Sequence, residues 1–126
     1  MSEVKLSGVP ILRVLSAAGA KEFYCETLGF SLDWEHYYAE GAPVYMQVSR
    51  DGLILHLSEN QRFQTGNIAY VATSGIESLH AQLARATQAW TPPAITSTPW
   101  NSKQLEIEDP FQNLLRFNED DSSRDS

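Results

Sequence analysis

Apolar and polar residues repeat with two different periods along this chain. A short apolar segment at 9–14 predicts a strand, and apolar residues at helical spacing within 20–27 predict a helix. Ser16 can cap the start of that helix, and Gly29 suits the left-handed position after its end. Alternating apolar and polar residues then predict three strands, at 30–35, 44–48 and 53–58.

The same order of periods occurs again in the second half of the chain. After a polar linker at 58–66, residues 67–72 read as a strand. Ser74 and Glu77 have the spacing of a capping box, and apolar residues of 76–83 recur at helical spacing. Short apolar segments predict three further strands, at 95–97, 104–107 and 114–117.

Two successive strand–helix–three-strand units predict an α+β fold. Residues 1–117 then form a single domain of two βαβββ modules, at about 1–60 and 67–117. We expect one curved mixed sheet with the helices on its convex side and a concave groove on the other. Residues 118–126 are polar and acidic, which predicts a flexible tail.

Composition narrows the class of partner. The chain has 126 residues and a formal net charge of −7, which disfavours nucleic acid and anionic membranes as partners. It lacks an apolar stretch of membrane-spanning length and the layout of a secretory signal at its start, so we expect a cytoplasmic protein. The single cysteine, Cys25, has no internal partner for a disulfide and reads as an inert, partly buried thiol.

Two phrases carry a resemblance to a known family. Two segments resemble motifs of the vicinal oxygen chelate superfamily: the end of the first helix, Phe23–Phe30, and the turn at Asp109–Phe117. This superfamily includes glyoxalase I, extradiol dioxygenases and antibiotic resistance proteins. The resemblance extends from about Leu6 to Phe117. Within the superfamily the chain is most similar to the bleomycin resistance proteins, through the segments Gly8–Leu12, Leu28–Trp34, Leu55–Ser58, Asn67–Val71 and Pro99–Trp100. One departure is Gln112, which stands where these proteins have a glycine.

The resemblance also indicates where a metal would bind in an enzyme of this superfamily. Its metal ligands come from the first, fifth and eighth strands, at positions near Val9, Asn67 and Arg116 in this chain. Valine cannot ligate a metal, and a guanidinium group repels a divalent cation. We therefore expect no metal, no other cofactor and no catalytic residue. The alternative is a metal-dependent lyase of the glyoxalase type, or a thiol transferase, whose ligands lie elsewhere.

The resemblance implies binding and sequestration of a bleomycin-like cationic glycopeptide antibiotic without catalysis. Such a ligand needs aromatic faces for its planar part and carboxylates for its charge. Trp100 is the expected stacking platform, on a polar loop. The other expected contacts are Trp34 and Tyr38 as the opposing wall, Tyr70 on the fifth strand, Asp33 and Glu22 for the cationic part, Pro10 at the floor, and His56 pointing into the groove.

Three alternatives remain open at this stage. Trp34 alternates with Phe30 and Leu32, a pattern that fits a core residue as well as a groove residue. Arg13 and Arg116 face the concave side; paired with Glu106 or Glu108 they leave the surface neutral, and unpaired they favour an anionic ligand. The ligand could also be another antibiotic or a metabolite.

The resemblance also implies a homodimer in which two chains exchange their first strands, through the arm Met1–Gly8.

Overall fold

The order of helices and strands confirms the α+β class and the repeated module. The computed structural model describes residues 3–37 and 39–120. The first module contains β1 (Ile11–Arg13), α1 (Ala17–Ala20), η1 (Lys21–Thr27), β2 (Ser31–Tyr37), β3 (Val44–Arg50) and β4 (Leu53–Ser58). The second contains β5 (Ile68–Ala72), α2 (Ile76–Ala86), β6 (Thr96–Ser97), β7 (Ser102–Glu108) and β8 (Leu114–Asp120).

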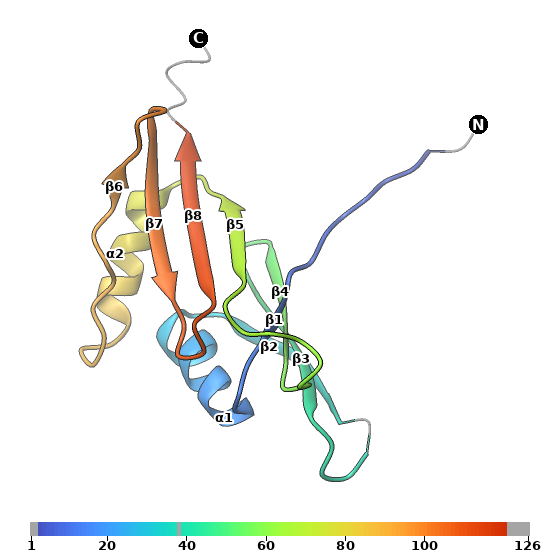
Figure 1. Ribbon diagram of the computed structural model, residues 1–126. Coiled ribbons are helices and arrows are strands. Elements are labelled where there is room, and N and C mark those ends of the chain that lie inside the picture. Colours follow the sequence, from blue (N-terminus) through green and yellow to red (C-terminus); the bar gives the residue numbers. More distant parts are fainter. Residues whose placement is uncertain (1–2, 38, 121–126) are drawn as a thin grey trace.

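Each module forms its own four-stranded sheet, and the two sheets have the same topology (Figure 1). The first sheet has the order β1-β4-β3-β2 and the second sheet the order β5-β8-β7-β6. In each, the first strand pairs in parallel with the last strand of its module, and the remaining pairs are antiparallel. The described strands of one chain therefore form two separate sheets and not one continuous curved sheet.

Each sheet has one buried face and one uncovered face. In the first sheet Met46, Val48 and Leu55 are fully buried, whereas the residues that alternate with them are partly or largely exposed. In the second sheet Leu105 and Leu115 occupy the buried face. The buried faces and the helices share a single hydrophobic core. The uncovered faces are therefore the surfaces on which either sheet can meet a ligand or another chain.

The first helix begins and ends where the sequence predicts. The Ser16 hydroxyl accepts a hydrogen bond from the Gly19 amide at 3.0 Å, and Gly29 has a φ of +80°. The helix is α-helical over α1 and widens to a π-helix over η1, so its last turn closes with a bond from the Leu28 amide to the Phe23 carbonyl. The sequence did not predict this widening.

The predicted cap of α2 is wrong. Gly75, with a φ of 81°, is the residue before the helix, and Ser74 makes no capping bond. Instead the Ile76 amide donates to the Glu119 carboxylate at 2.7 Å. Glu119 belongs to β8, which continues to Asp120, so residues 118–120 are not part of the predicted tail. Residues 121–126 lie outside the described part of the chain.

The turn between β7 and β8 joins the two modules. One carboxylate oxygen of Asp109 accepts from the backbone amides of Phe111 and Asn113, both at 2.8 Å. The other accepts from the Tyr24 hydroxyl of η1 at 2.7 Å, and the Asn113 side chain donates to the Arg13 carbonyl at the end of β1, also at 2.7 Å. Burial, followed by the Asp109 charge, raises the pKa of Tyr24, so the phenol remains a donor. This turn positions the second sheet relative to the first.

Candidate functional site

A β-bulge at Asp33 decides which way Trp34 points. The pairing of β2 with β3 shifts between Leu32, which lies opposite Val48, and Trp34, which lies opposite Gln47. Leu32 therefore lies on the same side of the sheet as Val48, with 39% of its surface exposed, and Trp34 lies on the uncovered face with 41% exposed. The alternation of Phe30, Leu32 and Trp34 along one face, which the sequence suggested, is broken at the bulge.

Three rings pack together on the uncovered face of the first sheet. Trp34 stacks on Tyr45, with ring centroids 5.9 Å apart and planes inclined by 24°. The His56 ring meets both edge-on, at 5.4 Å from Trp34 and 5.1 Å from Tyr45. We call Trp34, Tyr45 and His56 the ring cluster. Neighbouring β2, β3 and β4 each supply one ring, so the sheet itself fixes their arrangement.

A chain of side-chain hydrogen bonds runs through the ring cluster to a carboxylate. The Tyr45 hydroxyl lies 2.7 Å from His56 Nδ1, and His56 Nε2 lies 2.9 Å from the Gln47 amide oxygen. The Gln47 amide nitrogen then donates to Asp33 at 3.0 Å. Bonds from Gln47 and Ser49 lower the pKa of Asp33, whereas burial lowers the pKa of His56. The site thus presents a neutral imidazole and an ionised carboxylate.

The start of β1 borders the ring cluster. The His56 amide donates to the Pro10 carbonyl at 2.9 Å, and Ile11 lies opposite His56 in the parallel pair. Ile11 is 41% exposed and extends the apolar part of this face. Arg13, the next residue of β1 on the same side, donates to the Phe63 carbonyl at 3.0 Å. The surface around the rings therefore combines the apolar Ile11 with the Gln47 amide and, at its β2 edge, the Asp33 carboxylate.

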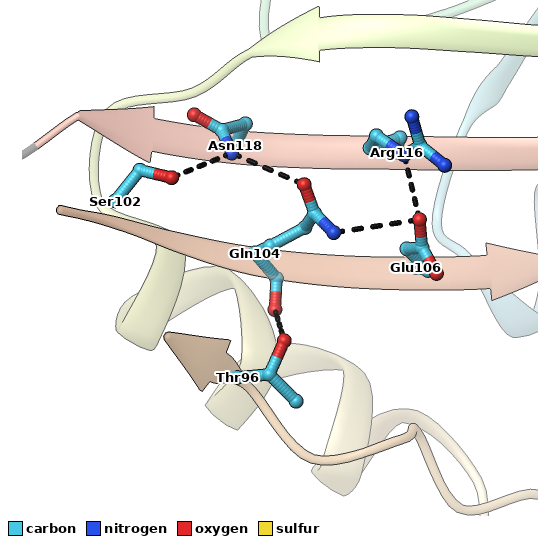
Figure 2. A network of polar contacts seen from close by, with 6 residues as sticks. All are labelled: Thr96, Ser102, Gln104, Glu106, Arg116 and Asn118. Atoms are coloured by element: carbon cyan, nitrogen blue, oxygen red, sulfur yellow. Dashed lines mark hydrogen bonds and ion pairs between the residues drawn. The ribbon is translucent and has the colours of Figure 1, made fainter. Parts of the chain in front are cut away.

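The uncovered face of the second sheet is polar instead. Arg116 forms an ion pair with Glu106 at 2.6 Å, as one of the sequence alternatives predicted. Figure 2 shows this pair continuing along β7 and β8 as a row of hydrogen bonds. The row, here called the polar stripe, consists of Ser102, Gln104, Glu106, Arg116 and Asn118, with Thr96 bonded to the Gln104 carbonyl. Because Arg116 and Glu106 balance each other, the polar stripe carries little net charge.

The structure brings together three of the eight predicted contacts. Asp33, Trp34 and His56 meet at the ring cluster on the first sheet, whereas Pro10 reaches it only through its backbone carbonyl, which accepts from the His56 amide. Tyr70, which is 62% exposed, lies on β5 beside Arg116 of the second sheet. In Figure 1 the turn between β6 and β7, which carries Trp100, lies at the opposite end of the molecule from β2 and β3. Within one chain, therefore, Trp100 and Trp34 are not opposing walls of one groove.

Two other predicted contacts have different outcomes. Glu22 is exposed on η1, whose Phe23 and Tyr24 pack into the core under the buried face. The first sheet therefore separates Glu22 from the ring cluster of its own chain. Tyr38 lies outside the described residues.

Tyr45 and Gln47 were not among the predicted site residues. Both alternate with the buried Val44, Met46 and Val48, so they must face the other side of β3. His56 was assigned to the groove by the same reasoning, and it lies opposite Gln47 in the β3–β4 pair. The alternation of apolar and polar residues along β3 was therefore sufficient to predict that Tyr45 and Gln47 face the site.

A cleft of about 720 Å³ also lies between the modules. Its walls are the turn between β3 and β4, the end of β5 and one side of α2, and Tyr70 is the one predicted contact that lines it. Its floor includes Phe117 and Ile107, which belong to the core. The cleft thus lies at the boundary between the two modules. The aromatic rings and the Asp33 carboxylate come together at the ring cluster instead. We take the ring cluster as the candidate site on chemical grounds.

Among the described residues, no three histidine, cysteine, aspartate or glutamate side chains come together as a possible metal site. Two of the positions compared with superfamily ligands have other partners. Asn67 donates from its side chain to the Gln64 carbonyl, and Arg116 pairs with Glu106.

Comparison with known proteins places this geometry in a family. Residues 2–124 match the glyoxalase superfamily. The chain belongs to that superfamily. No curated protein matches it.

Several solved structures share the fold of this glyoxalase superfamily member. A bleomycin-binding protein complexed with bleomycin gives a TM-score of 0.71 at 17% identity, over 93% of this chain and 100% of that one. A bleomycin-binding protein from bleomycin-producing Streptomyces verticillus, complexed with copper(II)-bleomycin, gives 0.67 at 24% identity, over 93% and 97%. A glyoxalase-related enzyme from Clostridium phytofermentans gives 0.71 at 19% identity, over 94% and 98%. Identities this low establish the fold and leave the function open.

The described helices offer no candidate membrane span. The family match and the fold thus confirm the resemblance seen in the sequence.

Proposed function

We propose that this protein binds and sequesters a bleomycin-like cationic glycopeptide antibiotic, without converting it, in the cytoplasm. The ring cluster is the observation that carries the proposal. Trp34 is 41% exposed and stacked on Tyr45, so its open face is available to a planar heteroaromatic group. Asp33 directly precedes Trp34 on the same strand and can attract a cationic group attached to that plane.

The fold supports the same proposal at the level of the family. The structures that this chain resembles include bleomycin-binding proteins solved with bleomycin, although identity is low. We carry over the binding of an antibiotic of that class as a hypothesis. Nucleic acid, membrane and metal have no part in it.

We further propose that the complete site requires two chains. Each chain has an aromatic half-site on the first sheet and a polar half-site with Tyr70 on the second. In a homodimer the first sheet of one chain can face the second sheet of its partner. Trp100 and Tyr70 of the partner, which are 58% and 62% exposed, would then close a shared groove over Trp34. Two such grooves form in one dimer.

Thermal stability in the presence of ligand tests the binding proposal. A ligand that binds only the folded protein raises the melting temperature. We expect metal-free bleomycin to raise it at concentrations where a neutral quinone and an anionic metabolite do not. A larger shift with the anionic compound would contradict the choice of ligand class.

Trp34→Ala tests the role of the ring cluster. Loss of the stacking face should weaken bleomycin binding by about 2 kcal/mol, roughly thirtyfold, as measured by calorimetry. Trp90→Phe is the matched control, because Trp90 packs edge-on against Phe23 on the helix side of the protein. It should leave the affinity unchanged. Equal affinity of the wild type and Trp34→Ala would remove the ring cluster from the site.

The second candidate is an enzyme. Its support is the shared fold with a glyoxalase-related enzyme, which is as good structurally as that with a bleomycin-binding protein. Such an enzyme would need a metal as Lewis acid, with ligands that the sequence comparison does not identify. Activity on a thiol adduct that is lost on chelation and restored by Zn²⁺, Ni²⁺ or Mn²⁺ would favour it over sequestration.

A further inference from the structure

Gln47 determines which nitrogen of His56 carries a hydrogen. The Asp33 carboxylate can only accept hydrogen bonds, so the Gln47 group that faces it at 3.0 Å must be the NH2 group. The Gln47 amide oxygen therefore faces His56 Nε2 at 2.9 Å, and this nitrogen must donate. His56 Nδ1 is left with a lone pair, which accepts from the Tyr45 hydroxyl at 2.7 Å.

The three bonds run in one direction, from Tyr45 to Asp33, when His56 is uncharged. A second proton on the imidazole would occupy Nδ1 and face the hydrogen of the Tyr45 hydroxyl, which would have to turn away. The charge would also sit 5.4 Å from the Trp34 ring and 5.1 Å from the Tyr45 ring. It would then occupy the place of a cationic ligand at these π systems and repel it.

The other ionisable groups around His56 come from each adjacent strand. On β1, Arg13 lies opposite Ser58, two residues from His56. On β2, His36 lies opposite Tyr45, and Asp33 acts through Gln47. On β3, Tyr45 bonds His56 directly. Partial burial disfavours a charged imidazole, and Asp33, the nearby carboxylate, is separated from it by the Gln47 amide.

We propose that Gln47 is a positioning and specificity residue. It holds His56 as the neutral Nε2–H tautomer, so that the ring cluster offers a cationic aromatic ligand an uncharged π surface next to Asp33. This inference rests on the proposed function for the nature of the ligand. The tautomer itself can be measured without any ligand.

Nuclear magnetic resonance of 15N-labelled imidazole groups tests the first half of the proposal. In the ligand-free wild type at pH 7 we expect His56 to show the Nε2–H pattern. Gln47→Met keeps the side-chain length and removes both polar contacts, so His56 should become a mixture of tautomers. Ser49→Ala is the control, because Ser49 bonds Asp33 and leaves the Gln47–His56 contact intact. A protonated or Nδ1–H His56 in the wild type, or an unchanged spectrum in Gln47→Met, would overturn the proposal.

Calorimetry with metal-free bleomycin between pH 5 and pH 7.5 tests the second half. We expect wild-type affinity to fall about tenfold toward pH 5 as His56 becomes charged, and Gln47→Met to bind several-fold more weakly at pH 7 with a shifted pH profile. The same affinity and pH profile in both proteins would refute a specificity role. If the wild type binds no bleomycin at any pH, the proposed function fails. The resonance experiment then decides alone whether Gln47 positions His56.

Discussion

At the residue scale, Gln112 is the clearest case of a position that the sequence marked as unusual. It stands where the resembling proteins have glycine, and its φ is +72°. A side chain is strained in this left-handed region, yet the turn keeps the conformation because Asp109 accepts the Phe111 and Asn113 amides on either side of it.

Gln112→Gly should therefore stabilise the protein. Relief of left-handed strain is worth about 1 kcal/mol, from which the greater freedom of glycine in the unfolded chain subtracts part. We expect a net gain of a few tenths to about 1 kcal/mol in the free energy of unfolding, measured by urea denaturation. Loss of stability would show that the glutamine side chain makes a contact that outweighs the strain.

His56 should make stability depend on pH. Burial lowers the pKa of His56 in the folded protein, so the unfolded chain binds the proton more readily. The stability linked to the neutral imidazole is therefore complete above the unfolded pKa, about 6.5, and is lost as the pH falls below that value and through the lower pKa of the folded protein. Relative to His56→Phe, which cannot titrate, the wild type should lose stability between pH 7.5 and pH 5. A constant difference across this range would contradict the direction of the shift.

At the element scale, the sequence predicts features that depend on neighbouring residues and misses features that depend on distant ones. The Ser16 cap and the Gly29 stop depend on local chemistry, and both were predicted. The cap of α2 was not, because Glu119 comes from β8, 43 residues away from Ile76. The bulge at Asp33 is likewise determined by pairing with β3, and it reverses the side on which Trp34 lies.

Glu119→Ala should destabilise α2. The substitution leaves the Ile76 amide without its charged acceptor, at a cost of about 1 kcal/mol in the free energy of unfolding. Glu119→Gln is the matched variant, since its amide oxygen can still accept, and it should retain most of the stability. The rate of hydrogen exchange at the Ile76 amide should rise in the alanine variant and not in the glutamine variant. Equal stability of the two variants would mean that Glu119 has no capping role.

At the scale of the whole molecule, the sequence predicted the modules but not where each half-site would lie. Periodicity within segments predicted both βαβββ units, and strand alternation placed His56 on the uncovered face. Periodicity cannot tell how two sheets are placed relative to each other. That placement depends on distant contacts such as Tyr24 with Asp109, 85 residues apart, and it separates β2 from the turn that carries Trp100.

A homodimer would bring the half-sites together. Residues 3–8 extend away from the rest of the chain (Figure 1), and Val4 and Leu6 are 81% and 92% exposed. We expect light scattering to give twice the 14.1 kDa mass of one chain. Removal of residues 1–8 should yield monomers that bind bleomycin at least tenfold more weakly. A stable full-length monomer with full affinity would show that one chain suffices.

Calorimetric titration with metal-free bleomycin, followed by mass spectrometry of the recovered compound, examines binding and conversion in one sample. We expect one bleomycin molecule per chain, and recovery of the compound with its mass unchanged after prolonged incubation. Absence of binding heat, or recovery of a chemically altered compound, would contradict a protein that captures its ligand without turnover.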